Sequence, residues 1–333
     1  MTPSTYPTSR RLFQTGLALA SLCTAAALFA APASAADDYP SKPVHLVVAF
    51  TAGGTTDMLA RSVGKELGSQ FNQSFIVENK PGAGGNIGTE YVVHAPADGY
   101  TLNVNSVGPI AVNESLYSNL RFNALKDLVP VVQIANVPNV LVVNPSLPVK
   151  NFEEFVAYAR SHKSQLNYGS TGVGTSSHLS SFMLSKEIGA DATHIPYKGA
   201  TAVTDLMAGR IQFMFATIPS VIGQIRAGKL RALAVSSLKR SRSLPDLPTV
   251  AEKGFPGFSA ASWFGIFAPK GTPRNVIDKI NAGVNKALPN LEKQMIQEGA
   301  DPVGGTPEEF SDFVHAEYKK WKTVVAESGA KQQ

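Results

Sequence analysis

Short apolar runs alternate with segments of helical periodicity along most of the chain. Residues 44–50 form a nearly continuous apolar run, which is typical of a buried parallel strand. After a loop of glycine and threonine, Leu59, Val63 and Leu67 repeat every four residues and predict a helix that starts near Asp57. The pattern then predicts a strand, a Gly-rich loop, a helix and a third strand at residues 74–78, 79–86, 87–94 and 101–105. This part of the chain is therefore expected to form a βαβαβ unit.

A second unit with the same alternation follows a Val-rich stretch at residues 131–143. The pattern predicts helices at residues 152–159, 176–188, 201–208 and 219–227, and strands at residues 166–168, 193–197, 212–216 and 230–236. A further apolar strand at 259–268 and two helices at 273–288 and 307–326 complete the chain, with Tyr318 and Trp321 expected to pack in the core. Two α/β units in one chain imply a cleft between them, where small-molecule sites commonly lie.

The composition is that of a globular protein with a sizeable core. Apolar residues make up 44% of the 333 residues and charged residues 17%, which excludes disordered and collagen-like chains. The formal net charge of +5 is small and spread along the chain. Because nucleic-acid binding usually needs a clustered basic face, we expect no nucleic-acid partner.

The first 35 residues have the features of an export signal. Arg10 and Arg11 precede a mostly apolar stretch at residues 12–31, and the sequence 33–35 is a small-residue cleavage site. The paired arginines leave both the Sec and the twin-arginine route open, and a retained N-terminal anchor is the alternative that we favour less. Since Cys23 is the only cysteine and lies in this segment, the exported chain is expected to lack disulfides, thiol nucleophiles and Cys metal ligands.

The loop at residues 51–57 is the first candidate site. It joins an apolar strand to a helix, where free amide groups and the helix dipole favour a carboxylate or a phosphate. Gly53 and Gly54 allow close approach of the backbone, and Thr55 and Thr56 add hydroxyl donors. The alternative is an ordinary helix cap, which would account for one Thr or Asp but not for the whole run. Asp57 either caps the helix, the role that we favour, or accepts a ligand ammonium group.

The loop at residues 169–178 repeats this arrangement in the second unit. It consists of small and hydroxyl-bearing residues between a strand and a helix, so two such loops could each hold one end of a ligand across the cleft. The alternative is a flexible turn with Ser176 as the helix cap. His178 lies just past the loop, where either a ligand contact or an ordinary helical role is open.

Other motifs point away from cofactors and catalysis. The Gly-rich run at residues 81–88 misses the dinucleotide fingerprint because Ile87 stands at the last glycine position, so NAD is rejected, while loop packing and a lining role remain open for Gly85 and Asn86. The histidines form no zinc motif, and no Gly-x-Ser-x-Gly elbow occurs. We therefore predict no cofactor, no metal and no catalytic residue. Lys198 could attract an anion or could simply be exposed.

Several long motifs resemble the Bug family, the periplasmic solute-binding receptors of tripartite tricarboxylate transporters. They lie at residues 53–57, 77–88, 97–102, 168–179, 194–199, 247–252 and 268–273 and cover essentially the whole exported chain in order. One departure is Ala52, since many relatives have proline before the glycine pair. The resemblance implies an α/β fold of the two-domain periplasmic binding protein class (type II, venus flytrap), in which each domain is a β-sheet flanked by helices. It also implies a periplasmic, monomeric, non-enzymatic receptor.

In this family the loops after the first strand of each domain hold a carboxylate. Carried over, the resemblance predicts domain 1 at residues 36–136 plus 255–333 and domain 2 at residues 137–254, with hinges near Asn136 and Phe255. The predicted ligand-binding residues are Phe50, Ala52, Gly53, Gly54, Thr55, Thr56, Asp57, Gly85, Asn86, Ser106, Ser170, Thr171, Gly172, Val173, Gly174, Thr175, Ser176, His178, Tyr197, Ala216 and Thr217.

The expected ligand is a small carboxylated metabolite, either an organic acid, an aromatic carboxylate or an amino acid. The expected partners are the inner-membrane permease subunits of a tripartite transporter. Two alternatives stay open: a periplasmic sensing subunit that docks a signalling partner, and a hydrolase that uses a serine such as Ser170 in the cleft.

Overall fold

Strand β1 (Val44–Val48) begins the first of two β-sheets in the computed structural model, which describes residues 1, 3, 39–199, 201–329 and 331. The first sheet has the spatial order β11 (Asp301–Gly304), β4 (Leu128–Val137), β10 (Ser262–Pro269), β3 (Thr101–Ser106), β1 and β2 (Phe75–Asn79). Strands β1, β2 and β3 are parallel to each other, whereas β10 and β11 run antiparallel to β4. Apart from residues 1 and 3, the predicted export signal lies outside the described residues.

The second sheet comes from the middle of the chain. Its spatial order is β7 (Thr193–Pro196), β6 (Asn167–Ser170), β8 (Phe213–Thr217), β5 (Asn139–Val143) and β9 (Arg231–Val235). Strand β6 is parallel to both neighbours, and β5 is antiparallel to β8 and β9. The predicted alternation of strands and helices is confirmed in both sheets, as is the mixed α/β fold class.

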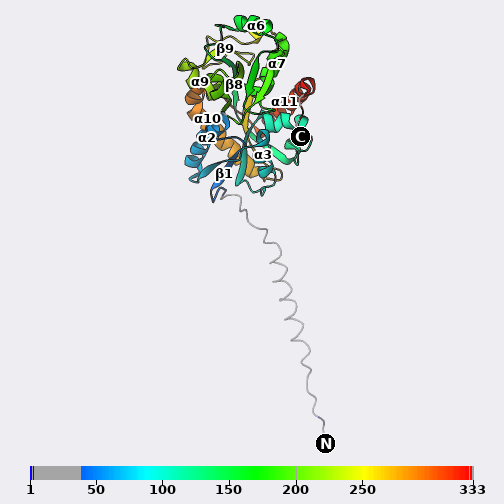
Figure 1. The fold of residues 1–333 in the computed structure, drawn as a ribbon. Coiled ribbons are helices and arrows are strands. Elements are labelled where there is room, and N and C mark those ends of the chain that lie inside the picture. The colour runs from blue at the N-terminus through cyan, green and yellow to red at the C-terminus, as the bar shows by residue number, and fades with distance from the viewer. Residues whose placement is uncertain (2, 4–38, 200, 330, 332–333) are drawn as a thin grey trace. The chain divides into compact units, whose positions relative to one another are not determined.

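Helices cover the faces of both sheets. Those between or after strands of the first sheet are α2 (Thr55–Phe71), α3 (Asn86–Val93), α4 (Asn113–Leu116), α5 (Ala124–Asp127), α10 (Arg274–Glu298) and α11 (Pro307–Ser328), with the short turns η2 (Ala83–Gly85) and η3 (Gly108–Val112). Those of the second sheet are α6 (Phe152–Ser161), α7 (Ser176–Ile188), α8 (Thr201–Met207), α9 (Ile218–Arg226) and the turn η4 (Ala251–Lys253). In Figure 1 the labelled elements α6, α7, β8 and β9 lie together, away from β1 and α3.

The chain crosses between the sheets twice, once at Pro138 and once in residues 236–261. The two crossings are tied together, because the Asn139 side chain donates a hydrogen bond to the Ala260 carbonyl (2.8 Å), and the Ala260 amide donates one to the Ser236 carbonyl (3.0 Å). Phe255 packs edge-on against Phe152 of α6, with 5.9 Å between ring centroids.

One large buried apolar cluster includes residues of both sheets. It contains Val47 of β1, Trp263 of β10, Leu141 of β5 and Phe213 of β8, together with the fully buried Trp321 of α11. Residues 40–333 accordingly form one compact unit. The packing role predicted for Trp321 is confirmed. The boundaries of the two domains stay a prediction.

One predicted helix end is wrong, and one strand was not predicted. Helix α10 was expected to end at residue 288 but continues through Pro289 to Glu298, because Leu291 and Met295 bury side chains beyond the proline. The missing amide of a proline in a helix costs one hydrogen bond, which that burial offsets. The sequence pattern also missed β11, whose proline and glycine argue against a strand.

Candidate functional site

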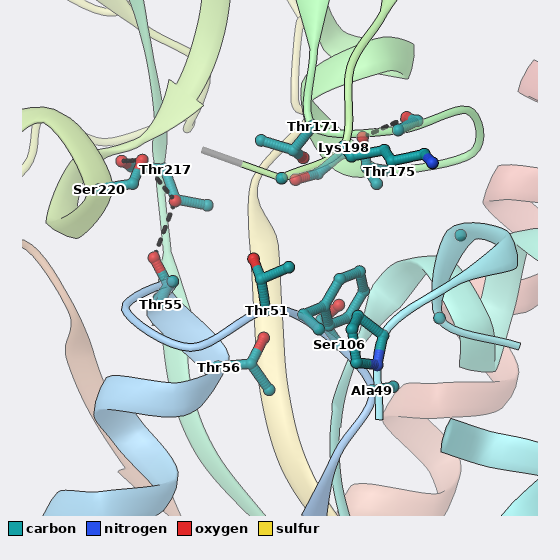
Figure 2. Close-up of a pocket in the computed structure, with 18 of the residues that line it drawn as sticks. Ala49, Thr51, Thr55, Thr56, Ser106, Thr171, Thr175, Lys198, Thr217 and Ser220 are labelled. Atoms are coloured by element: carbon teal, nitrogen blue, oxygen red, sulfur yellow. Dashed lines mark hydrogen bonds between the residues drawn. The ribbon is translucent and has the colours of Figure 1, made fainter. Parts of the chain in front are cut away.

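A cavity of about 410 Å³ lies between loops of the two sheets. The lining segments lie at or just after the carboxyl ends of β1, β2, β3, β6, β7 and β8, the edge of an α/β sheet where ligands commonly bind. Figure 2 shows the two groups of side chains facing each other, with Thr51, Thr55, Thr56 and Ser106 on one side and Thr171, Thr175 and Lys198 on the other.

The loop after β1 brings the amino end of α2 to the cavity. Gly54 is the cap residue of α2 and has an extended backbone. Because glycine has no side chain to accept a capping bond, the first amides of the helix receive no acceptor from the cap residue. Gly53 has a φ of 79°, in the region that favours glycine, and the turn brings Thr55 and Thr56 to the cavity. Thr51, the first residue of the predicted loop, also lines it.

Asp57 lies in this loop but does not line the cavity. Its buried carboxylate accepts hydrogen bonds from the Gly53 amide (3.0 Å), from Arg61 at both oxygens (3.0 and 2.9 Å) and from Asn79 (2.9 Å). Burial alone raises the pKa of Asp57, but the bonds from Arg61, Gly53 and Asn79 outweigh it and hold the pKa below its ordinary value. Asn79 also donates to the Phe50 carbonyl (3.0 Å), so this cluster fixes both ends of the loop.

The loop after β6 presents the amino end of α7. Thr175, and not Ser176, is the cap residue: its hydroxyl accepts a hydrogen bond from the His178 amide. Thr171, Gly172, Thr175 and Ser176 line the cavity. The two strand-to-helix loops therefore both reach one cavity, as the sequence predicts.

Ser170 is fully buried behind this loop. Its hydroxyl lies 2.7 Å from Nε2 of His194 and donates to the Gly172 carbonyl at 3.1 Å, so it faces the protein and not the cavity. A serine nucleophile must reach its substrate. The geometry therefore gives no support to the hydrolase alternative built on Ser170.

His178 and His194 stack on each other beneath the loop, with 3.9 Å between ring centroids, and Tyr168 stacks on His194. Nδ1 of His178 accepts a hydrogen bond from the Gly174 amide (3.2 Å). Burial lowers the pKa of His194 to about 4, and burial together with the charge of His194 lowers the pKa of His178 to about 3. Both rings are therefore neutral supports of the loop at physiological pH.

A third helix also begins at the cavity. Thr217 is the cap residue of α9, and Ser220 lies in the first turn of the same helix. The Thr217 hydroxyl lies 2.8 Å from the Thr55 hydroxyl, which joins the loops of the two sheets directly across the cavity (Figure 2). Ser220 was missed from the sequence, although its position three residues after Thr217 places both hydroxyls at one helix end.

Thirteen of the 21 predicted residues line the cavity: Phe50, Gly53, Gly54, Thr55, Thr56, Gly85, Ser106, Thr171, Gly172, Thr175, Ser176, Tyr197 and Thr217. The other eight do not: Ala52, Asp57, Asn86, Ser170, Val173, Gly174, His178 and Ala216. Asn86, for example, is buried and accepts a hydrogen bond from Asn113 (2.5 Å). The sequence places residues in loops, but it does not show which way their side chains point.

Lys198 is the only charged side chain among the described residues that line the cavity. It is exposed, and within the described part of the chain its ammonium group makes no ion pair. Phe50, Tyr197, Val203 and Phe264 add apolar surface. The cavity thus combines hydroxyl and amide donors with one cation and an apolar wall.

Among the described residues, no group of three or more His, Cys, Asp or Glu side chains could hold a metal ion. None of the helices in the described residues is both long enough and apolar enough to pass through a membrane.

Comparisons with known proteins identify the family. Residues 59–330 match the tripartite tricarboxylate transporter family receptor, TctC. Protein BugT of Bordetella pertussis is 39% identical over 319 residues, which cover 95% of this chain and 98% of BugT. The structure of R. palustris Rpa4515 with adipate is similar with a TM-score of 0.84 and 37% identity, over 88% of this chain and 99% of that one.

MatC (Rpa3494) from Rhodopseudomonas palustris with bound malate has a TM-score of 0.81 and 32% identity, over 86% of this chain and 100% of that one. These matches confirm the resemblance to the Bug receptors and the periplasmic binding protein fold. The chain belongs to the tripartite tricarboxylate transporter family of receptors.

Proposed function

We propose that this receptor captures a small organic acid in the cavity between its two sheets and delivers it to a tripartite transporter. The observation that carries the proposal is the convergence of the amino ends of α2, α7 and α9 on one cavity, with Lys198 as its only charged lining residue among those described.

The chemistry of the lining favours an anion. The first amides of a helix and its dipole stabilise negative charge, and threonine and serine hydroxyls at all three helix ends can donate to carboxylate oxygens. Since no carboxylate lies among the described lining residues, an ammonium group would find no ionic partner there. Of the three ligand classes expected from the sequence, we therefore favour an organic acid over an amino acid.

The similar structures support this ligand class. Rpa4515 is described with adipate and MatC with malate, and both are small dicarboxylic acids. By analogy we place the receptor in the periplasm, exported through residues 1–35, and we infer binding without turnover. The inner-membrane permease subunits of the transporter are the proposed partners.

Closure of the two sheets around the ligand is the proposed mechanism. We take the two sheets as the cores of the predicted domains at 36–136 plus 255–333 and at 137–254, with the predicted hinges near Asn136 and Phe255 absorbing the motion. The contact between Thr55 and Thr217 then belongs to the closed form. Ligand bound to both faces stabilises that form by mass action.

A thermal-shift screen tests the proposal. The exported chain (residues 36–333) is stripped of bound ligand and heated with mono-, di- and tricarboxylates, aromatic acids, amino acids and the corresponding amides. Mass spectrometry of the molecule that co-purifies provides an independent identification. We expect one or more organic acids to raise the Tm and the corresponding amides to leave it unchanged. After incubation with the protein, the acid should be recovered chemically unchanged.

The variant Thr55→Val tests the location of the site. Removing a hydroxyl that donates to a charged group weakens binding roughly 10- to 100-fold. Thr193→Val, an exposed residue of β7 outside the cavity lining, is the matched control and should bind as the parent does. Equal binding by parent and Thr55→Val would place the site elsewhere, and turnover of the acid would contradict a receptor.

A further inference from the structure

A second cavity, of about 240 Å³, lies where α11, the ends of the first sheet and the two crossings meet. Phe313, Glu317 and Lys320 of α11 line it with the spacing of one helical face. Pro138 and Ser259 of the crossings also contribute. Residues of the first sheet, of the two crossings and of α11 therefore form this cavity, which we call the crossing cavity.

Strand β10 separates the crossing cavity from the ligand cavity. Phe264 lines the ligand cavity and Trp263 lines the crossing cavity, and neighbouring side chains of a strand point to opposite faces. Ser262, at the start of the strand, lines both. The two cavities are thus distinct sites on either face of one strand.

Most charged groups of the crossing cavity are already paired. Oε2 of Glu317 accepts the indole N–H groups of Trp263 (3.0 Å) and Trp321 (2.8 Å), and Oε1 pairs with Lys320 (2.5 Å). Arg240 pairs with Glu252 (2.9 Å). These side chains need no ligand to satisfy them.

Two groups of opposite charge remain without such partners. Asp301 of β11 is partly buried, and within the described chain its carboxylate makes no hydrogen bond or ion pair. Burial raises the pKa of Asp301, and the charge of Arg242 opposes this effect. Lys239, in the segment after β9, is exposed, and its ammonium group likewise makes no ion pair within the described chain. Lys239 and Asp301 do not pair with each other, although they line the same cavity.

We propose that the crossing cavity binds a small neutral α-amino acid, with the ligand ammonium group against Asp301 and the ligand carboxylate against Lys239. A simple anion would satisfy Lys239 but face Asp301, and a simple cation would do the reverse. A zwitterion can pair with both Asp301 and Lys239. Its ammonium group would then offset the free-energy cost of burying part of the Asp301 carboxylate without an ionic partner. Phe313 offers an apolar surface to the side chain of the amino acid. This site is independent of the organic-acid site.

Isothermal titration of the exported chain with L-alanine and L-glutamine tests the inference, in the absence of any organic acid. We expect binding of both amino acids. Ethylamine, which lacks the carboxylate, should bind at least about tenfold more weakly. Asp301→Asn and Lys239→Gln should each lower the affinity for the amino acids by about tenfold or more. Lys239 is exposed, so its variant keeps the test valid even if Asp301→Asn unfolds.

Three variants serve as controls. Asp246→Asn and Lys229→Gln change exposed charges outside the crossing cavity and should bind amino acids as the parent does. Thr55→Val weakens the organic-acid site and should leave amino-acid binding unchanged. The inference is overturned if neither amino acid binds, if Lys239→Gln binds as well as the parent does, or if Thr55→Val is the variant that loses binding.

Discussion

Individual polar residues in this receptor divide into those that face the ligand cavity and those that hold its loops. Asp57 and Ser170 belong to the second group, because their hydrogen bonds go to Gly53, Arg61, Gly172 and His194. Lys198 belongs to the first group, since it lines the cavity and has no ionic partner within the described chain. Substitutions in the first group should change ligand affinity, and substitutions in the second group should change the stability of the fold.

Lys198 should discriminate between mono- and dicarboxylates. The helix ends hold one carboxylate of the ligand, and an exposed lysine attracts a second with a modest energy that salt screens. We expect Lys198→Gln to bind dicarboxylates about two- to fivefold more weakly at low salt, with no change for monocarboxylates. Isothermal titration measures both, with Lys229→Gln as the control. An equal loss for both ligand classes, or none for either, would contradict this role.

His178 and His194 should make stability depend on pH. In the unfolded chain both rings take up a proton near the ordinary pKa of 6.5, whereas in the folded chain they stay neutral down to about 4 for His194 and about 3 for His178. The unfolded state then binds more protons, so stability is fully present above pH 6.5 and falls as the pH drops toward 4.

Thermal unfolding between pH 8 and 4.5 measures this effect. His194→Gln removes one of the two imidazole rings that take up a proton on unfolding. The variant should therefore show a smaller fall in Tm as the pH is lowered. His315→Gln, at an exposed position of α11, should leave the fall unchanged. A parent Tm that does not change between pH 6.5 and 4.5 would show that the rings are not held neutral by burial.

At the scale of elements, α10 is the instructive case. Its periodic apolar positions include Ile280, Val284, Leu291 and Met295, which are buried on both sides of Pro289. The sequence rule that proline ends a helix is a statement about the local backbone, and here tertiary burial overrides it.

Pro289→Ala should therefore stabilise the protein. The substitution restores an amide to the helix interior, and the gain is reduced by the greater freedom of alanine in the unfolded chain. We expect the free energy of unfolding to rise by about 1–2 kcal/mol, measured by guanidinium denaturation. A lower free energy of unfolding would mean that the proline ring makes packing contacts worth more than the lost hydrogen bond.

Local patterns predict most of the elements and the two cavity loops, but not the partners that lie far apart in sequence. The helix over residues 176–188 has the boundaries predicted from its periodicity. By contrast, β11 is held by pairing with β4, a contact more than 160 residues away that its short sequence does not reveal. Likewise, the sequence places Asp57 and His178 in or next to the two loops. Asp57 instead bonds to Asn79 of β2, and His178 stacks on His194 of β7, so neither side chain lines the cavity.

On the scale of the whole molecule, the bond between Thr55 and Thr217 joins the loops of the two sheets across the cavity. Residues that contact each other contribute non-additively to stability. Thr55→Val and Thr217→Val should each lower the free energy of unfolding. The double variant should lose less than the sum of the two, by about 0.5–1.5 kcal/mol. Denaturation of the four proteins measures this difference, and additive losses would mean that the hydroxyls do not interact in solution.

The position of a bound organic acid tests the central claim most directly. A crystal structure of the exported chain with a dicarboxylate identified in the thermal-shift screen would locate it. We predict that one carboxylate lies within hydrogen-bond distance of the first amides of α2 and of hydroxyls from α7 or α9, with the second carboxylate toward Lys198. A dicarboxylate bound outside this cavity, or held in it without contact to any of the three helix ends, would contradict the account.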